Sequence, residues 1–508
     1  MNIKKKKLHS QLLENDPELI KEISNNIIDY FFEHINSDIK YPVKDFSKAK
    51  VIKVDKFSKN NINIKKLLNI IDTEIFDQAI YKCQVNYLRF IDDGSSAVNI
   101  IASTINSLLN QNLTTHLSDS PGATFNEISL IREIRQRIGY DVGKDVKSIA
   151  EVGGYFTSGG MMSNMAAILI ARNACQPEAQ TNGVINNNYK LIVPQLASHY
   201  STWNGMGWLG FGENNVIHVK TNNFRYSIKD LDAVLKKTIN DGNKVLAVIA
   251  TLGDPYSMTI EDICAVHKLC KKYKVWLHGD GANGGVLIFS GKYRNLIKGI
   301  ELCDSVSLDP HKAMGLNYPN SIFVCKDVKK FNSVISYWNI INRKDGFDLG
   351  MITPFLNSRG FDSLKLWILL KYFGTNGVSK IIDNKIETTR KIYSEISCIK
   401  NVLFWNKPNT FSILFQVIPN YIIFSKECKD DAYVKKINEI QKEFINYLNI
   451  NSKIQIHSFD LPASIFYKKT IVLGVQSTVL CIQNAHEKIP IELINEFKRH
   501  IIKFCNKN

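Results

Sequence analysis

The chain has 508 residues, of which 44% are hydrophobic and 22% charged, a composition typical of globular proteins and long enough for two or three subdomains. Its net charge is +16, but the lysines are spread along the chain without a nucleic-acid-binding motif, so we expect no nucleic-acid partner. No stretch of about 18 apolar residues is present and polar residues follow the basic start, so we expect neither a membrane span nor a secretory signal.

The ten cysteines are scattered along the chain and form no C-x-x-C pair. Several lie in apolar or helical stretches, as buried free thiols do, for example Cys175, Cys303 and Cys325. This pattern favours a reduced, cytoplasmic compartment and predicts neither a disulfide framework nor a metal site.

The first 150 residues are predicted to be mainly helical. Residues 1–80 are typical of amphipathic helices, and the spacing of apolar residues predicts a helix over 98–112. A further helix is predicted over 124–139, where Thr124 and Glu127 match a capping box and Gly139 marks the end.

From about residue 150 onward, short apolar runs alternate with amphipathic segments. We predict buried strands over 190–195, 244–251, 274–280, 305–309 and 321–326, and helices over 161–173, 228–239 and 260–273. This alternation predicts an α/β fold in which helices cover both faces of a mainly parallel sheet. Ligands of such sheets collect at the carboxyl ends of the strands.

The last part of the chain is predicted to form a smaller α+β domain. Its expected elements are a helix over 380–396, strands near 401–405, 411–417 and 470–482, and a final helix over 490–504. We therefore divide the chain into an N-terminal helical segment (1–115), a large α/β domain (116–380) and a small C-terminal domain (381–508).

A glycine-rich stretch, TSGGMMSN at 157–164, opens one of the predicted helices. Backbone N–H groups of this stretch can approach a phosphate closely, and the helix dipole favours an anion there. A plain glycine-rich turn is the alternative, and this short motif taken alone favours it.

Two further motifs follow predicted strands. His199, in SHYS at 198–201, is placed where an imidazole can stack on an aromatic ring, although a lone histidine is more often structural. Asp280, in LHGDGANGG at 277–285, ends an apolar strand, where an unpaired carboxylate is costly. A protonated pyridine nitrogen is a suitable partner, and Gly281 and Ala282 leave room for a flat ring. A strand-end turn capped by the aspartate is the alternative.

Lys312, in SLDPHKAMG at 307–315, follows an apolar strand and a proline turn. An amine in a crowded pocket beside His311 can act as a nucleophile, whereas most lysines of this chain are surface residues. His199, Asp280 and Lys312 follow the glycine-rich helix start in this order, and the ordered set is more specific than any one motif.

In these motifs the chain resembles the group II pyridoxal-phosphate (PLP) dependent amino-acid decarboxylases, which include the glutamate, aromatic-amino-acid and cysteine-sulfinate enzymes. The resemblance covers about 80–375 and is strongest at 157–172, 244–285 and 305–318. It implies the fold type I of PLP-dependent transferases, with 116–380 as the PLP-binding domain. It also implies an L-amino-acid decarboxylase that forms a homodimer, with the segment 1–115 contributing to dimerisation and to the pocket.

The resemblance implies a role for each matching residue. Lys312 would bind PLP as a Schiff base, Asp280 would pair with the pyridinium nitrogen, and His199 would stack on the ring. The other matching cofactor positions are Gly160 and Met161 at the phosphate, Ser305 and His311 near it, and Thr251 and Ala282 beside the ring.

On the substrate side, SRGFDSLKLW at 358–367 resembles the family's arginine segment and would place Arg359 near the substrate carboxylate. Position alone makes Thr115, Leu113, Phe90 and the loop 337–350 candidates for selecting the substrate side chain. The identity of the amino acid stays open, because several residues depart from the family's usual pattern: Met161, Met162, Asn283 and Ala313.

Decarboxylation needs an acid that protonates the α-carbon. In the family a tyrosine on a loop after the lysine supplies this proton, and the matching stretch 333–350 offers Tyr337 as the donor and Phe347 as a rival occupant. A phenylalanine at that position would indicate oxygen-dependent aldehyde formation instead. Transamination and other carbon–carbon cleavage on the same fold are further alternatives. A non-enzymatic binding protein that uses its basic charge is another, but the intact lysine, aspartate and histidine argue against it.

Overall fold

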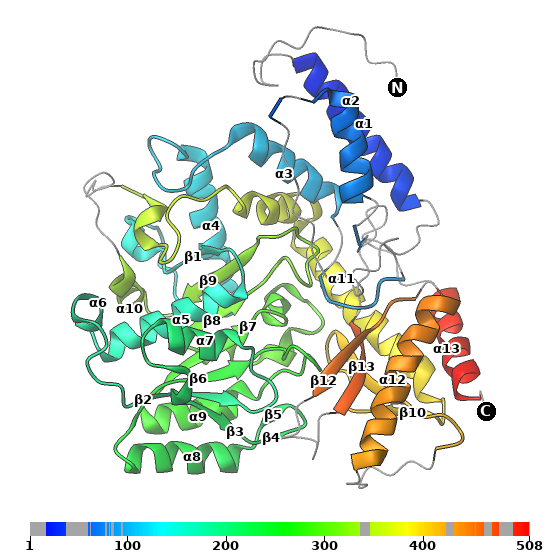
Figure 1. The fold of residues 1–508 in the computed structure, drawn as a ribbon. Helices are drawn as coiled ribbons and strands as arrows, with labels where there is room; N and C mark the ends of the chain where they lie inside the picture. The colour runs from blue at the N-terminus through cyan, green and yellow to red at the C-terminus, as the bar shows by residue number, and fades with distance from the viewer. Residues whose placement is uncertain are drawn as a thin grey trace. The chain divides into compact units, whose positions relative to one another are not determined.

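A computed structural model describes residues 17–36, 59–60, 62–76, 79–80, 82, 86–92, 95–335, 346–422, 431–452, 454–461, 470–476 and 491–506 (Figure 1). By compactness the chain divides into two units, Met1–Gln84 and Val85–Asn508. The predicted boundaries at 115 and 380 both lie inside the second unit. No helix in the described ranges is long and apolar enough to cross a membrane.

The first unit contains helices, as predicted. They are α1 (Pro17–Asn36), α2 (Ile64–Ile70) and a π-helical turn (Ile71–Ile75) that continues α2. Asn63 caps α2, because its side-chain oxygen accepts the backbone N–H of Lys66 at 2.9 Å. The rings of Tyr30 and Phe76 lie 5.2 Å apart and join α1 to the end of this helical stretch.

The second unit is built on a seven-stranded sheet in the order β1-β9-β8-β7-β6-β2-β3. The strands are β1 (Gly154–Thr157), β2 (Tyr189–Pro194), β3 (Val216–Val219), β6 (Lys244–Thr251), β7 (Trp276–Gly281), β8 (Ser305–Leu308) and β9 (Ser321–Cys325). All are parallel except for β9, which is antiparallel to both neighbours. The α/β prediction and the five predicted strands are confirmed. β1 and β3, each four residues long, were not predicted from the sequence.

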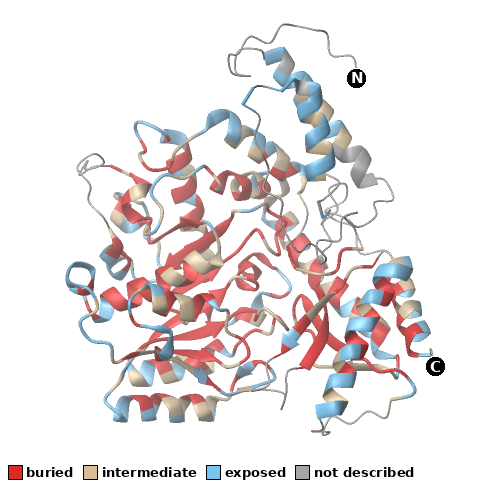
Figure 2. Ribbon diagram, in the orientation of Figure 1, coloured by how far each residue is buried: buried red, intermediate tan, exposed pale blue. Residues whose placement is uncertain are grey.

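The central strands are apolar because the sheet is covered on both faces. Every residue of β1, β7, β8 and β9 is buried, as Figure 2 shows in red. The register places Thr251 of β6 opposite Asp280 of β7, and Asp280 opposite Ser307 of β8. Three strand ends therefore present polar side chains next to one another.

Helices surround this sheet. α5 (Gly160–Cys175) packs against β6, β7, β8 and β9, and its residues Ala166–Asn173 are all buried. α8 (Ile228–Asn240) and α9 (Ile263–Tyr273) pack against β6 and against each other. The remaining helices here are α3 (Ala97–Leu109), α4 (Pro121–Ile138), α6 (Ala179–Asn182), α7 (Ser201–Trp208) and α10 (Val328–Phe331).

The predicted start of α4 is wrong. The helix begins at Pro121, whose missing N–H costs nothing in the first turn, so Thr124 lies inside the helix. The Thr124 hydroxyl lies 3.1 Å from that of Ser120, and Glu127 is fully buried instead of closing a capping box. The predicted end is confirmed, because Gly139 has a φ of 103°.

The C-terminal part forms a smaller α+β domain, as predicted. α11 (Ser363–Ser397) leads into it and is kinked at Gly374 (φ 64°, ψ 174°). The antiparallel sheet has the order β10-β11-β13-β12. Its strands are β10 (Val402–Phe404), β11 (Ser412–Val417), β12 (His457–Leu461) and β13 (Thr470–Gln476), and α12 (Asp431–Asn451) and α13 (Ile491–Cys505) complete the domain. Residues 477–482 of the predicted last strand lie outside the described residues.

Candidate active site

His199, Asp280 and Lys312 are far apart in the sequence but close together in the fold. Burial lowers the pKa of His199, the negative charge of Asp280 opposes this shift, and the positive charge of Lys312 adds to it. The imidazole is therefore neutral near pH 7. The backbone N–H of Ser201 donates to His199 Nδ1 at 3.2 Å, which leaves the ring proton on Nε2.

Asn164 of α5 fixes both Asp280 and the histidine loop. Its side-chain NH₂ group donates to Asp280 Oδ2 and to Ser201 Oγ, each at 2.9 Å. Ser201 Oγ in turn lies 2.9 Å from His199 Nδ1. One buried amide therefore orients the carboxylate and, through a serine, the imidazole.

The side-chain oxygen of Asn164 also has hydrogen-bond partners. Its oxygen lies 3.0 Å from His278 Nε2 and accepts the hydroxyl of Ser307 at 3.1 Å. Burial lowers the pKa of His278 to about 4, so this ring is neutral and donates its Nε2 proton. The hydroxyl of Ser305 lies 2.9 Å from His278 Nδ1 and completes the network.

Sequence reasoning missed Asn164 and His278, although both lie inside the motifs. The sequence signal for each was a polar residue within a mainly apolar segment: Asn164 on a helix and His278 on a strand. Such a residue needs a polar partner in the core. Which partners meet it is decided by the packing of α5 on β7 and β8.

Lys312 follows β8 in a turn that starts at Pro310. Its side chain is 26% exposed, and its Nζ lies 3.3 Å from Oδ2 of Asp309, whose side chain is only 2% exposed. The amine is therefore at the edge of the buried cluster and accessible to a ligand. Burial also lowers the pKa of the neighbouring His311, so its ring is neutral and accepts the Asn320 N–H at Nδ1.

The start of α5 faces the same cluster. A Cβ at Gly160 would lie 2.8 Å from Asp309 Oδ2 and 3.2 Å from the Ala282 Cβ, so only glycine fits this approach. The first N–H groups of a helix, here those of Gly160 and Met161, have no partner within the helix. These N–H groups favour an anion, and the position in front of them, called the anion position below, adjoins Ala282 and Asp309.

Arg359 forms an ion pair with the buried carboxylate of Glu127. Its Nη1 donates to Glu127 Oε2 at 2.8 Å and its Nη2 to Oε1 at 2.5 Å. Glu127 is fully buried and also accepts the backbone N–H of Phe156 at 3.3 Å. The guanidinium, expected near the substrate carboxylate, is therefore held by α4 in this structure.

The remaining predicted residues are distributed around the second unit. Thr251 ends β6 and donates to the carbonyl of Ala197 at 3.1 Å. The Ser305 hydroxyl accepts Trp276 Nε1 at 3.0 Å at the start of β8, whereas Ser307 reaches Asp280 Oδ1 at 3.4 Å.

The candidate residues for selecting the substrate side chain, Thr115 and Phe90, contact different parts of the second unit. Thr115 donates to Asp119 at 2.6 Å, and its neighbour His116 is in ring contact with Phe347. Phe90 instead packs on His457 of the small domain at 4.4 Å. Leu113 is fully buried. Tyr337 lies outside the described residues.

The cluster fits PLP on its own chemistry. A phosphate fits the anion position at α5, a protonated ring nitrogen fits the Asp280 carboxylate, and an aldehyde carbon can be reached by the Lys312 amine. Neutral His199 is suited to stack on the ring between them. Among the described residues, no group of three or more His, Cys, Asp or Glu side chains is placed to hold a metal ion.

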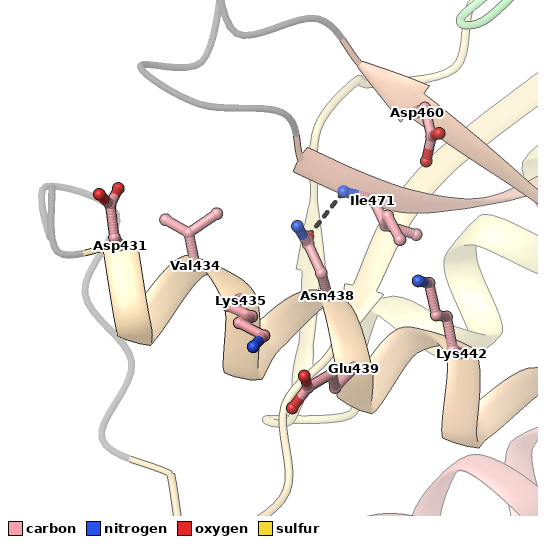
Figure 3. Close-up of a pocket in the computed structure, with 8 residues that line it drawn as sticks. All are labelled: Asp431, Val434, Lys435, Asn438, Glu439, Lys442, Asp460 and Ile471. Atoms are coloured by element: carbon pink, nitrogen blue, oxygen red, sulfur yellow. Dashed lines mark hydrogen bonds between the residues drawn. The ribbon is translucent and has the colours of Figure 1, made fainter.

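A surface hollow of about 440 Å³ lies beside α12 on the small domain (Figure 3). Asn438 accepts the backbone N–H of Ile471 at 2.7 Å within it. Its residues, none of which belongs to the Lys312 cluster, are Asp431, Val434, Lys435, Asn438, Glu439, Lys442, Asp460 and Ile471.

Known proteins resemble this chain in sequence and in fold. The chain is 29% identical over 319 residues to an L-2,4-diaminobutyrate decarboxylase of Acinetobacter baumannii, which covers 59% of this chain and 61% of that relative. It is 24% identical over 449 residues to an aromatic-L-amino-acid decarboxylase of Bacillus atrophaeus, covering 86% and 88% of the two chains.

Among solved structures, mouse CSAD in its apo form matches with a TM-score of 0.83 at 19% identity, over 97% of this chain and 100% of that one. At this identity the likeness concerns the fold alone. The family model described as the pyridoxal-dependent decarboxylase conserved domain matches residues 48–418. That range is most of the sequence and contains the whole Lys312 cluster, and the chain therefore belongs to the pyridoxal-dependent decarboxylase family.

Proposed function

We propose that the chain removes carbon dioxide from an L-amino acid with PLP bound covalently at Lys312. The convergence of His199, Asp280 and Lys312 beside the start of α5 carries this proposal. When bound, PLP supplies an electron sink for the electron pair that the departing carboxyl group leaves behind. Asp280 keeps the ring nitrogen protonated, and neutral His199 covers one face of the ring.

Asp280→Asn is expected to retain some PLP but to lose most turnover. The amide cannot hold a pyridinium proton by charge, and the loss of one charge-assisted contact costs about 1.5–3 kcal/mol, or roughly 10- to 150-fold in rate. The measurement is kcat together with the PLP content and absorbance of the variant. Near-normal kcat would remove Asp280 from this role.

The substrate is tested by carbon dioxide release from the twenty amino acids and from non-standard acidic and diamino ones. Amine, aldehyde and peroxide are measured together, because the relatives do not fix the product. Release from none of these compounds, with PLP bound, would contradict the decarboxylase assignment.

We propose that Tyr337 is the proton donor, because it lies in the stretch 333–350 that matches the family's tyrosine loop. A phenol is a suitable acid, and a positioned general acid contributes about 10²–10⁴-fold. Tyr337→Phe should therefore slow amine formation and divert product to aldehyde and peroxide. Amine formation at the wild-type rate would exclude Tyr337. Aldehyde as the main wild-type product would instead favour the oxidative reaction.

The chain is also proposed to act as a homodimer. Large apolar side chains are exposed on α3, in the segment before α4 and on α4 itself: Leu108 (78% exposed), Ile101 and Leu109 on α3, Leu117 before α4, and Phe125 on α4. Light scattering should give twice the chain mass, and Leu108→Lys should shift the protein toward monomer. Ile185→Lys, at another exposed apolar residue, is the matched control and should leave the dimer intact. A wild-type monomer with full activity would contradict the proposal.

A further inference from the structure

Asp309 is a buried carboxylate that lies where the site favours an anion. The residue is 1% exposed, and its two oxygens lie 2.8 and 3.3 Å from the point where Gly160, the first residue of α5, would carry a Cβ. Oδ1 is buried and has no hydrogen-bond partner among the residues that the structure describes. The carboxylate is therefore directed at the start of a 16-residue helix while one of its oxygens stays unsatisfied.

The surroundings satisfy only the other oxygen. Oδ2 lies 3.3 Å from Lys312 Nζ and 3.7 Å from His311 Nε2. An unsatisfied buried oxygen is costly, and a helix start offsets part of that cost because its N–H groups and dipole favour negative charge. The same features favour a phosphate. The Asp309 carboxylate and a phosphate group would therefore occupy the same position at the start of α5.

We propose that Asp309 is a built-in competitor for the anion position at the start of α5. Its carboxylate lies at that position in this structure, and it must turn away before a phosphate group enters. This inference rests on the proposed function, since the phosphate in question is that of PLP. It assigns Asp309 a role in cofactor binding and exchange, through charge repulsion rather than contact with substrate.

The test measures binding of inorganic phosphate to the cofactor-free protein by calorimetry and by thermal shift, at constant ionic strength. Asp309→Asn keeps the shape and removes the charge, so phosphate should bind roughly tenfold or more tightly than to wild type. Asp309→Ser is the second variant and should change affinity in the same direction. Equal or weaker phosphate binding by both variants would overturn the proposal.

Asp362→Asn is the matched control. Asp362 pairs with Lys365 at 2.8 Å with the same three-residue spacing as Asp309 and Lys312, but it lies outside the anion position. Its phosphate affinity should equal that of wild type. An equal gain in this control would mean that net charge alone is responsible, and the proposal would be wrong.

A second measurement separates this inference from the proposed function. Loss of PLP from the loaded protein is followed by absorbance after dilution, and it should be slower in Asp309→Asn than in wild type. A normal adduct at Lys312 with unchanged phosphate binding overturns the Asp309 role alone. Tighter phosphate binding with no adduct at Lys312 overturns the proposed function instead.

Discussion

Lys312→Ala is expected to lose roughly 10³-fold or more in kcat/KM and all covalently bound PLP. The alanine has no amine to bond the cofactor, and the Lys312 Nζ that faces Asp309 at 3.3 Å is removed as well. The measurement combines steady-state rates with borohydride reduction and peptide mapping. In wild type the reduced adduct should map to Lys312 and nowhere else.

The matched control is Lys292→Ala. Lys292 is an exposed lysine that pairs with Glu387 at 2.6 Å, away from the His199, Asp280 and Lys312 cluster. This variant should keep wild-type rates and the adduct at Lys312. An adduct on another lysine, or full activity of Lys312→Ala, would remove Lys312 from its assigned role.

Glu127→Gln is expected to lower the free energy of unfolding by about 3–5 kcal/mol, because it leaves the buried Arg359 guanidinium without its charge partner. Glu127 is 0% and Arg359 8% exposed at their side chains, so water cannot replace the lost carboxylate. The pair joins α4 to the segment before α11. Urea unfolding followed by circular dichroism measures the change.

Glu133→Gln on the same helix provides the comparison. Glu133 pairs with Arg137 at 2.7 Å, but its side chain is 42% exposed, and such surface pairs contribute about 0–1 kcal/mol. A small loss in Glu133→Gln and a large one in Glu127→Gln is the expected result. Similar small losses in both would show that Arg359 finds another partner.

The sequence by itself determined the main architecture and the reactive residues. Mainly apolar runs predicted five strands of the large sheet, since strands that are buried on both faces are nearly continuous in apolar residues. The motifs around His199, Asp280 and Lys312 were found in the same way, because polar residues directly after such runs mark the carboxyl ends of strands.

Only the tertiary structure decided how those residues are held. Asn164, His278 and Ser307 lie on three different elements, and nothing local to any of them predicts that they meet behind Asp280. The capping box failed for the same reason. Glu127 is compatible with a helix end by spacing, but the long-range contact with Arg359 is bidentate and buried, and it outweighs a local cap.

The position of Asp309 shows the same limit at a single residue. The sequence places it three residues before Lys312, which predicts proximity to the amine but not to α5. The approach of α5 to the turn after β8 depends on the absence of a side chain at Gly160 and on the packing of the helix across the sheet. The sequence therefore determines which charged groups lie near Lys312 along the chain. The packing of α5 on the sheet determines which of these groups face the start of the helix.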